Sequence, residues 1–174
     1  MASSNLRTVK TPLWSLVRLP ANLCLVYVLV LQQALAQAGD YIFYANSGTI
    51  TITGYIGSGG EVSIPDRIDG LPVANIGDFA FSDCSSLTGV TIPNSVTNIG
   101  YRAFFYCTSL TNVAIPNSIT SIGNSAFWNC TNLTSVVIPD SVIILGQYVL
   151  AGCTTLTTVT LCKNPGRFYR LRSP

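Results

Sequence analysis

Apolar residues recur along this chain with a fixed period of 23 positions. The recurring positions also include a glycine and a cysteine, and they run without a gap through four consecutive units. The columns are Ile76, Ile99, Ile122, Leu145; Gly77, Gly100, Gly123, Gly146; Ala80, Ala103, Ala126, Val149; Phe81, Phe104, Phe127, Leu150; Cys84, Cys107, Cys130, Cys153; Leu87, Leu110, Leu133, Leu156; Val90, Val113, Val136, Val159; and Ile92, Ile115, Ile138, Leu161. A constant period of this length predicts a solenoid, in which each unit buries its apolar face only against its neighbours.

Each unit contains the pattern of one short strand. Residues 87–92 end in an apolar and polar alternation of period two, and Pro93 follows. Proline lacks the amide hydrogen that a β-ladder needs, so it ends the strand. Strands that recur every 23 residues would stack in parallel about 4.8 Å apart. We therefore expect a repeat solenoid of the α/β type, mostly β, with one parallel sheet along one side.

The rest of each unit is expected to return as an irregular arc. Val96 and Ile99 would give this arc a second apolar edge, and Ala80 with Phe81 would form a single helical or 3₁₀ turn on the far side. The glycine that follows each isoleucine, such as Gly77, predicts a tight corner with a positive φ, which glycine adopts without strain.

These columns give the consensus I-G-x-x-A-F-x-x-C-x-x-L-T-x-V-x-I-P-x-S-V-T-x, which covers about residues 61–161. The consensus resembles the BspA-like class of leucine-rich repeat. The resemblance implies a right-handed leucine-rich-repeat solenoid, usually on secreted or surface-exposed proteins that bind other proteins or host and matrix components. It implies no catalytic residues, so we expect no enzyme activity and no cofactor.

The two ends depart from the repeat. Residues 41–44 and 49–53 are β-prone runs separated by a turn, which predicts a hairpin that caps the solenoid before the first strand at 61–64. The final unit is degenerate, so either Phe168, Tyr169 and Leu171 fold back over the last rung, or that sheet edge meets a partner. The expected organisation is a signal peptide at 1–38, an N-terminal β cap at 39–60, leucine-rich repeats at 61–162 and a C-terminal tail at 163–174.

The first 38 residues have the pattern of a secretory signal. Three basic residues precede an apolar stretch from 19 to 31, and Ala36 and Ala38 suit a cleavage site before Gly39. A retained membrane anchor is the alternative. However, the apolar stretch between Pro20 and the glutamine pair at 32–33 is shorter than the roughly 20 apolar residues that a span needs. We therefore expect a secreted or cell-surface protein, without a transmembrane segment once the signal is cleaved.

Composition narrows the possible chemistry. The 174 residues include no histidine, and only 9% are charged. The absence of histidine excludes Ser-His, Cys-His and His-ligated metal chemistry. Cleavage of residues 1–38 would remove three of the nine basic residues and none of the seven acidic ones, leaving six against seven, a net charge of −1. We therefore expect no nucleic-acid partner, because a binder of that class needs a basic surface.

The cysteine column invites three interpretations. Stacked thiols would lie about 5 Å apart, yet equivalent side chains on adjacent rungs run parallel, so free buried thiols are favoured over disulfides. A metal ladder is disfavoured because no histidine or acidic column accompanies the sulfurs. Cys162 lies outside the column and is the candidate for an intermolecular thiol.

Two surfaces are candidates for binding. The variable positions of the arc would bring aromatic and basic side chains together at Tyr101, Arg102, Phe105, Tyr106 and Trp128. Exposed rings of this kind anchor protein interfaces or stack on sugars; the alternative is that they lie flat over the turn and shield the core. The concave face of the sheet would present Thr91, Asn112, Ser135, Thr158 and Thr160.

The sequence therefore predicts a non-catalytic binding module for a protein or carbohydrate ligand. The alternative function is structural, with self-association through an uncapped C-terminal rung.

Overall fold

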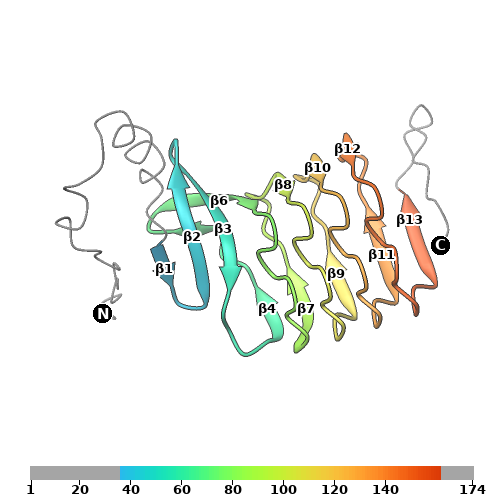
Figure 1. Cartoon of the computed structure of the whole chain (residues 1–174). Helices are drawn as coiled ribbons and strands as arrows, with labels where there is room; N and C mark the ends of the chain where they lie inside the picture. Colours follow the sequence, from blue (N-terminus) through green and yellow to red (C-terminus); the bar gives the residue numbers. More distant parts are fainter. Residues whose placement is uncertain (1–35, 162–174) are drawn as a thin grey trace, which may run out of the picture.

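The computed structural model describes residues 36–161, which form thirteen strands joined by turns, with no helix in that range. The strands coil around one axis as a solenoid (Figure 1). They are β1 (Ala36–Ala38), β2 (Tyr41–Asn46), β3 (Thr49–Tyr55), β4 (Gly60–Ser63), β5 (Arg67–Ile68), β6 (Leu71–Ile76), β7 (Leu87–Thr91), β8 (Asn98–Ile99), β9 (Asn112–Ala114), β10 (Ser121–Ile122), β11 (Ser135–Ile138), β12 (Ile144–Leu145) and β13 (Thr158–Leu161). The predicted class, a mostly-β repeat solenoid, is confirmed.

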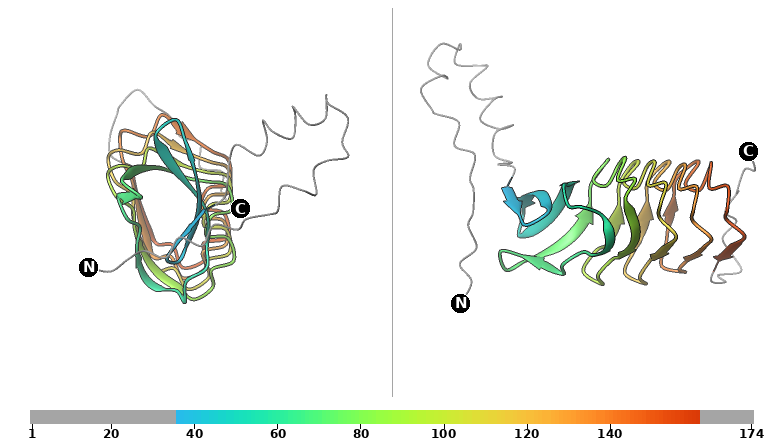
Figure 2. Two further views of the ribbon diagram at one scale, coloured as in Figure 1. Left: turned by 90° about the vertical axis from the view of Figure 1, so that its left-hand side faces the viewer. Right: turned by 90° about the horizontal axis from the view of Figure 1, so that it is seen from below.

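The strands at the end of each unit pair in parallel, as the sequence predicts, but they form two short sheets instead of one continuous sheet. Strands β4, β7 and β9 pair in parallel, and β11 pairs with β13 in the same direction. Equivalent positions pair across the rungs, as Val90 with Val113 and Val136 with Val159 show. Viewed along the axis, the coils superimpose (Figure 2).

A second parallel ladder runs along another side of the coil and was not predicted. Strands β6, β8, β10 and β12 pair in parallel through the isoleucine column, with Ile76 opposite Ile99 and Ile99 opposite Ile122. Strands β8, β10 and β12 have two residues each, which is too short for an alternating pattern to show in the sequence.

The predicted hairpin is present and covers the N-terminal end of the core. Strands β2 and β3 pair antiparallel. Strand β3 also pairs in parallel with β6, and this pairing joins the cap to the solenoid. The rings of Tyr41 and Tyr55 lie 6.5 and 5.1 Å from that of Phe81. The cap therefore adds two rings to the stack of buried phenylalanine rings that begins at Phe81, and it does more than shield the end of the core. In the first unit β5 and β6 pair antiparallel and form a second small hairpin.

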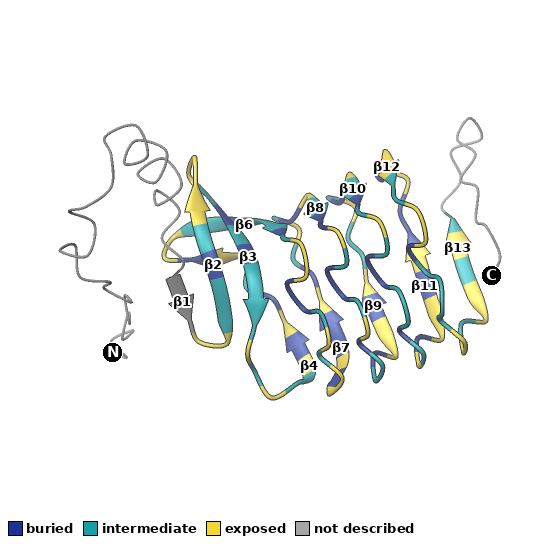
Figure 3. Cartoon of the chain, in the orientation of Figure 1, coloured by how far each residue is buried: buried dark blue, intermediate teal, exposed yellow. Residues whose placement is uncertain are grey.

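The core is a stack of identical layers (Figure 3). Phe81, Phe104 and Phe127 are fully buried and stack ring on ring, 5.0 and 5.1 Å apart. Burial of one such side chain contributes about 1.5–3 kcal/mol, and an aromatic pair adds about 0.5–1.5 kcal/mol. In the last rung the equivalent layer is only partly buried, as at Leu145 and Leu150.

The glycine column has a different cause from the one predicted. Gly77, Gly100, Gly123 and Gly146 do not have a positive φ. A Cβ at Gly100 would instead lie 2.6 Å from the carbonyl carbon of Gly77, and one at Gly123 would lie 2.6 Å from that of Gly100. The prediction of a left-handed corner was wrong, because close backbone approach between rungs selects glycine here.

The expected single turn at Ala80 and Phe81 is present, because the Ser82 amide donates to the carbonyl oxygen of Phe79 at 3.0 Å, but it does not continue as a helix. Phe79 and Asp83 have φ values of 59° and 61°, which interrupt any helical run. The amides of Phe79, Phe81 and Asp83 donate to carbonyl oxygens of the next rung, at 2.7–3.0 Å. Bonds between rungs therefore replace those that would continue a helix.

Candidate binding surface

The backbone of the arc fixes which side chains point away from the core. Arg102 and Tyr106 have left-handed φ values of 52° and 58°. Their amides, and that of Phe104 between them, donate to the next rung at 2.8–3.0 Å, so alternate residues are tied to the neighbouring coil. The ring of Phe104 enters the core, while Phe105 stays partly exposed on the surface.

Three aromatic rings from two adjacent rungs form one cluster on this surface. The ring of Phe105 stacks on Trp128 at 4.9 Å with an interplanar angle of 12°. Tyr106 meets both of them edge to face, at 4.7 and 5.0 Å. The structure therefore brings together the aromatic residues that the sequence placed in adjacent columns.

Arg102 extends this group to the preceding rung. Its guanidinium carbon lies 4.4 Å from the ring centroid of Phe105, 5.0 Å from that of Tyr101 and 6.0 Å from that of Phe79. Phe79 and Tyr101 also contact each other edge to face at 5.2 Å. Cation–π contacts of this kind stabilise by about 0.5–2 kcal/mol. We call the six residues the aromatic cluster: Phe79, Tyr101, Arg102, Phe105, Tyr106 and Trp128.

The aromatic cluster is only partly covered. Phe79 is 47% exposed, and Tyr101 and Tyr106 are each 37% exposed. Phe105, Trp128 and Arg102 are half-buried. Within the described residues the Nε atom of Arg102 is buried without a hydrogen-bond partner. The rings thus cover part of the turn and also offer faces and edges to solvent, the combination that anchors partners in interfaces.

The concave sheet is a weaker candidate surface. Its predicted contact residues lie on β7, β9, β11 and β13 and are all exposed, as expected. They are Thr91, Asn112, Ser135, Thr158 and Thr160. Their side chains are small and uncharged, and Val137 is the large apolar residue exposed among them. This face offers few groups that could fix the orientation of a ligand.

The cysteines are free thiols in the part of the chain that the structure describes. Cys107 and Cys130 are buried, and their sulfurs donate to the carbonyl oxygens of Phe81 and Phe104 at 3.0 and 3.2 Å. Burial raises the pKa of the Cys107 thiol, and the hydrogen bond with Cys153, together with burial, raises the pKa of the Cys130 thiol. In residues 36–161 no group of cysteines and carboxylates is arranged to hold a metal ion. Cys162, the predicted intermolecular thiol, lies outside the described residues.

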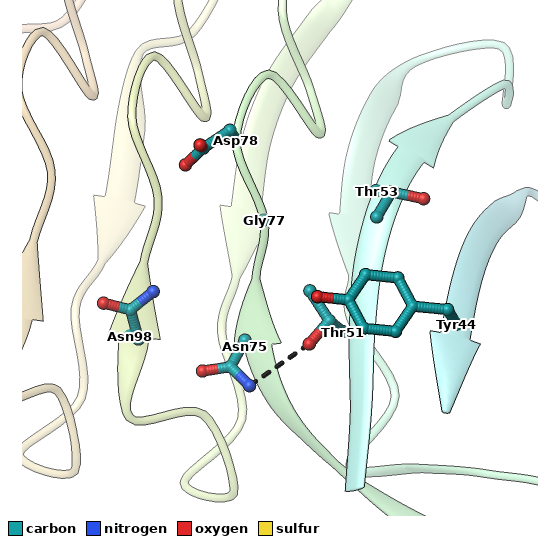
Figure 4. A pocket seen from close by; sticks show the side chains of 7 residues that line it. All are labelled: Tyr44, Thr51, Thr53, Asn75, Gly77, Asp78 and Asn98. Carbon is teal, nitrogen blue, oxygen red and sulfur yellow. Dashed lines mark hydrogen bonds between the residues drawn. The ribbon is translucent and has the colours of Figure 1, made fainter. Parts of the chain in front are cut away.

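A polar groove lies beside the N-terminal cap and was not predicted (Figure 4). Its volume is about 490 Å³, and it lies over the outer face of strands β3, β6 and β8. The lining residues are Tyr44, Thr51, Thr53, Asn75, Gly77, Asp78 and Asn98. Asp78 links the groove to the aromatic cluster, because its Oδ1 accepts a hydrogen bond from the amide of Tyr101 at 2.7 Å.

The family assignment follows from the repeats. The model of the BspA type leucine-rich repeat region, in six copies, matches residues 61–170. The chain belongs to this family. The match begins where we placed the first repeat and runs past residue 162, where we placed the last.

Solved structures of leucine-rich repeat proteins resemble this one. A leucine-rich repeat protein from Bacteroides capillosus is 33% identical with a TM-score of 0.67, covering 74% of this chain and 99% of that one. The T. pallidum leucine-rich repeat protein is 31% identical with a TM-score of 0.59, covering 69% and 68%. A leucine-rich cell surface protein from Faecalibacterium prausnitzii is 33% identical with a TM-score of 0.59, covering 72% and 42%. A search of curated proteins gave no match.

This BspA-type chain has no helix among its described residues that is long and apolar enough to cross a membrane. The predicted signal segment lies mostly outside those residues. Strand β1 is the described part of it, and it pairs antiparallel with β2, with Ala38 opposite Tyr41. Cleavage before Gly39 would therefore remove an edge strand and leave the β2–β3 hairpin as the cap.

The polar groove of this BspA-type protein escaped sequence reasoning for a physical reason. Three of its residues, Tyr44, Thr51 and Thr53, come from the cap, which lies outside the 23-residue repeat. A signal was present in the alternation of residues 49–53, which places Thr51 and Thr53 on the face opposite Ile50 and Ile52.

Proposed function

We propose that this protein is a non-catalytic binding module that acts outside the cell or at the cell surface. In this proposal the aromatic cluster holds a protein or glycan ligand. The aromatic cluster carries the proposal, because it gathers five rings and one guanidinium on a partly exposed surface of three successive arcs. The family and the Faecalibacterium prausnitzii cell surface protein support the proposed location.

The chemistry of the aromatic cluster fits recognition better than catalysis. No carboxylate forms an ion pair with Arg102 in the described part of the chain, and no nucleophile or general base joins the rings. The ring faces and the guanidinium can hold a ligand by stacking and by removing apolar surface from water. Suitable ligand groups are an aromatic or aliphatic side chain of a protein or the flat face of a sugar.

The test is a ligand screen on arrays of glycans and of extracellular matrix proteins with the full chain. Hits are then measured against Trp128→Ala and Phe105→Ala. Loss of one stacking ring should weaken binding at least tenfold, or about 1.4 kcal/mol. The matched control is Tyr148→Ala, because Tyr148 is an exposed aromatic with the same left-handed backbone that makes no ring contact with the aromatic cluster. Unchanged affinity in both cluster variants would refute the proposed contact face.

Self-association through the C-terminal rung is a second candidate function. The observation that favours it is the partial exposure of Leu145, Leu150 and Leu156, whose counterparts in the preceding rung are fully buried. Ile143 and Ile144 are also about 60% exposed nearby. Light scattering coupled to size-exclusion chromatography over a concentration series would detect such assembly. A monomer at every concentration would refute it, and an oligomer lost in reductant would point to Cys162.

A further inference from the structure

We propose that the polar groove beside the cap binds one ring of a neutral carbohydrate. The inference deepens the proposed binding function by adding a second site and a ligand class, and it rests on that function for the link to the aromatic cluster. At about 490 Å³ the groove falls within the range of small-molecule sites.

Strand register builds the groove as a row of polar side chains. Tyr44 pairs with Thr51 across β2 and β3, Thr51 pairs with Asn75 on β6, and Asn75 pairs with Asn98 on β8. Paired residues point to the same face, and neighbouring strands lie about 4.8 Å apart. Figure 4 shows these side chains on one face of the sheet, with Asp78 above them. The row therefore presents a series of polar groups along one face, from Tyr44 to Asn98.

The lining retains free hydrogen-bonding capacity of both kinds. The Asn75 amide nitrogen donates to Thr51 Oγ1 at 3.2 Å, which leaves its carbonyl oxygen as an acceptor. Asp78 uses Oδ1 for the Tyr101 amide, which leaves Oδ2. The side chains of Tyr44 and Asn98 have no hydrogen-bond partner among the described residues. Vicinal hydroxyls of a sugar both donate and accept, so they match this mixture of carboxylate, amide and phenol.

Charge and polarity distinguish a neutral sugar from other ligands. Asp78 is the one charged residue in the lining, and no lysine or arginine lines the groove. A phosphate or uronic acid would therefore meet a carboxylate without a cation to offset it. A peptide is disfavoured, because the lining has no aliphatic side chain that could form a pocket for an apolar anchor.

The groove is connected to the aromatic cluster through Asp78. Asp78 lies at its border, and the next residue, Phe79, packs its ring against Tyr101. A carbohydrate chain that leaves the groove over Asp78 would meet these two rings, whose faces suit a second sugar unit. The two surfaces therefore form one extended site for a ligand of two or more rings.

The experiment is a ¹H–¹⁵N chemical-shift titration of the full chain. The neutral probes are maltotriose, cellotriose and triacetylchitotriose, and the comparison probes are trigalacturonate and tetraglycine. We expect at least one neutral trisaccharide to shift the side-chain amides of Asn75 and Asn98 and the backbone amide of Gly77. Asn98→Ala should weaken that binding at least fivefold, without loss of stability, since this side chain makes no hydrogen bond within the described fold. Asn94→Ala is the matched control, because Asn94 is an exposed asparagine in a loop outside the groove, and it should bind as the wild type does.

Each outcome decides the proposal. It is overturned if no neutral trisaccharide shifts the groove amides, if trigalacturonate or tetraglycine shifts them as strongly, or if Asn98→Ala binds normally. Shifts confined to Phe105 and Trp128 would overturn the groove while leaving the proposed function intact. Chemical shifts of the groove amides that persist in Trp128→Ala would support binding in the groove. The array measurements on the cluster variants test the proposed function separately.

Discussion

Replacement of Gly123 by alanine tests whether close packing between rungs, and not a left-handed backbone, selects the glycine column. The added Cβ would lie 2.6 Å from both the carbonyl carbon of Gly100 and the amide nitrogen of Tyr101. Ordinary contacts between carbon atoms are about 3.5–4.0 Å, so the two rungs must separate locally by about 1 Å. Both atoms belong to backbone, which cannot swing aside as a side chain can.

The cost can be worked out from the surrounding bonds. The Gly123 amide donates to the carbonyl of Ile99 at 2.8 Å, and a separation of about 1 Å would abolish this bond, at about 1 kcal/mol. Overpacking adds about 1–3 kcal/mol. Alanine also lowers the conformational entropy of the unfolded chain relative to glycine, and this offsets about 0.4–1 kcal/mol of the cost. We expect Gly123→Ala to lower the free energy of unfolding by about 2–3 kcal/mol.

Urea denaturation followed by circular dichroism would measure this change. Gly89→Ala is the matched control, because Gly89 also lacks a positive φ and its added Cβ would meet the movable carboxyl end of exposed Glu61 at 3.1 Å. That variant should be neutral or more stable by up to about 1 kcal/mol. Equal unfolding midpoints for the two variants would refute the reasoning.

Three further predictions concern the core and its ionisable groups. Phe104→Ala should lower the free energy of unfolding by about 3–5 kcal/mol, which is more than the loss in Leu150→Ala. Phe104 is stacked on both sides, whereas Leu150 is partly exposed. Similar losses for the two variants in urea titrations would contradict the layered core. Cys107 and Cys130 should resist a thiol reagent in the folded state. Burial raises the pKa of Cys107, and the hydrogen bond with Cys153 together with burial raises the pKa of Cys130, so stability should hold below about pH 9, where unfolded thiols stay protonated, and fall above it, with a shallower fall in Cys107→Ala. Burial, together with the neighbouring Tyr55 and Asp40, raises the pKa of Tyr41 to about 12, so ultraviolet titration should show a late ionisation that is lost in Tyr41→Phe; a late ionisation that persists in this variant would contradict the assignment.

The layered core was predictable because every rung repeats it. Columns such as Phe81 and Leu87 recur at one period, and a buried position in one rung implies a buried position in the next. The hairpin was predictable from local alternation, and its turn at Ser47 and Gly48 adopts positive φ at both positions. Pattern and turn chemistry therefore determined most of the architecture.

Features that depend on contacts between rungs were not predictable in the same way. The glycine column was assigned its local preference, a left-handed corner, and the single turn in each arc gave no indication of the bonds that its other amides make to the next rung. Backbone approach at Gly100 overrides that preference, and amides that bond to the next rung, as at Phe81, keep the turn from continuing as a helix. Sequence columns also placed Phe105 beside Trp128, but they gave no indication that Arg102 would lie over three rings.

The left-handed positions of the arc have a consequence for engineering. Successive rungs hold Phe79, Arg102, Ser125 and Tyr148 at the same φ of 52–59°, so this backbone accepts aromatic, basic and small polar side chains alike. Each 23-residue unit can therefore serve as a cassette whose outward residues are randomised while its inward residues stay constant. A library built on positions 102, 105, 106 and 128 would vary recognition without redesign of the scaffold, and duplicated units would lengthen the surface by about 4.8 Å each.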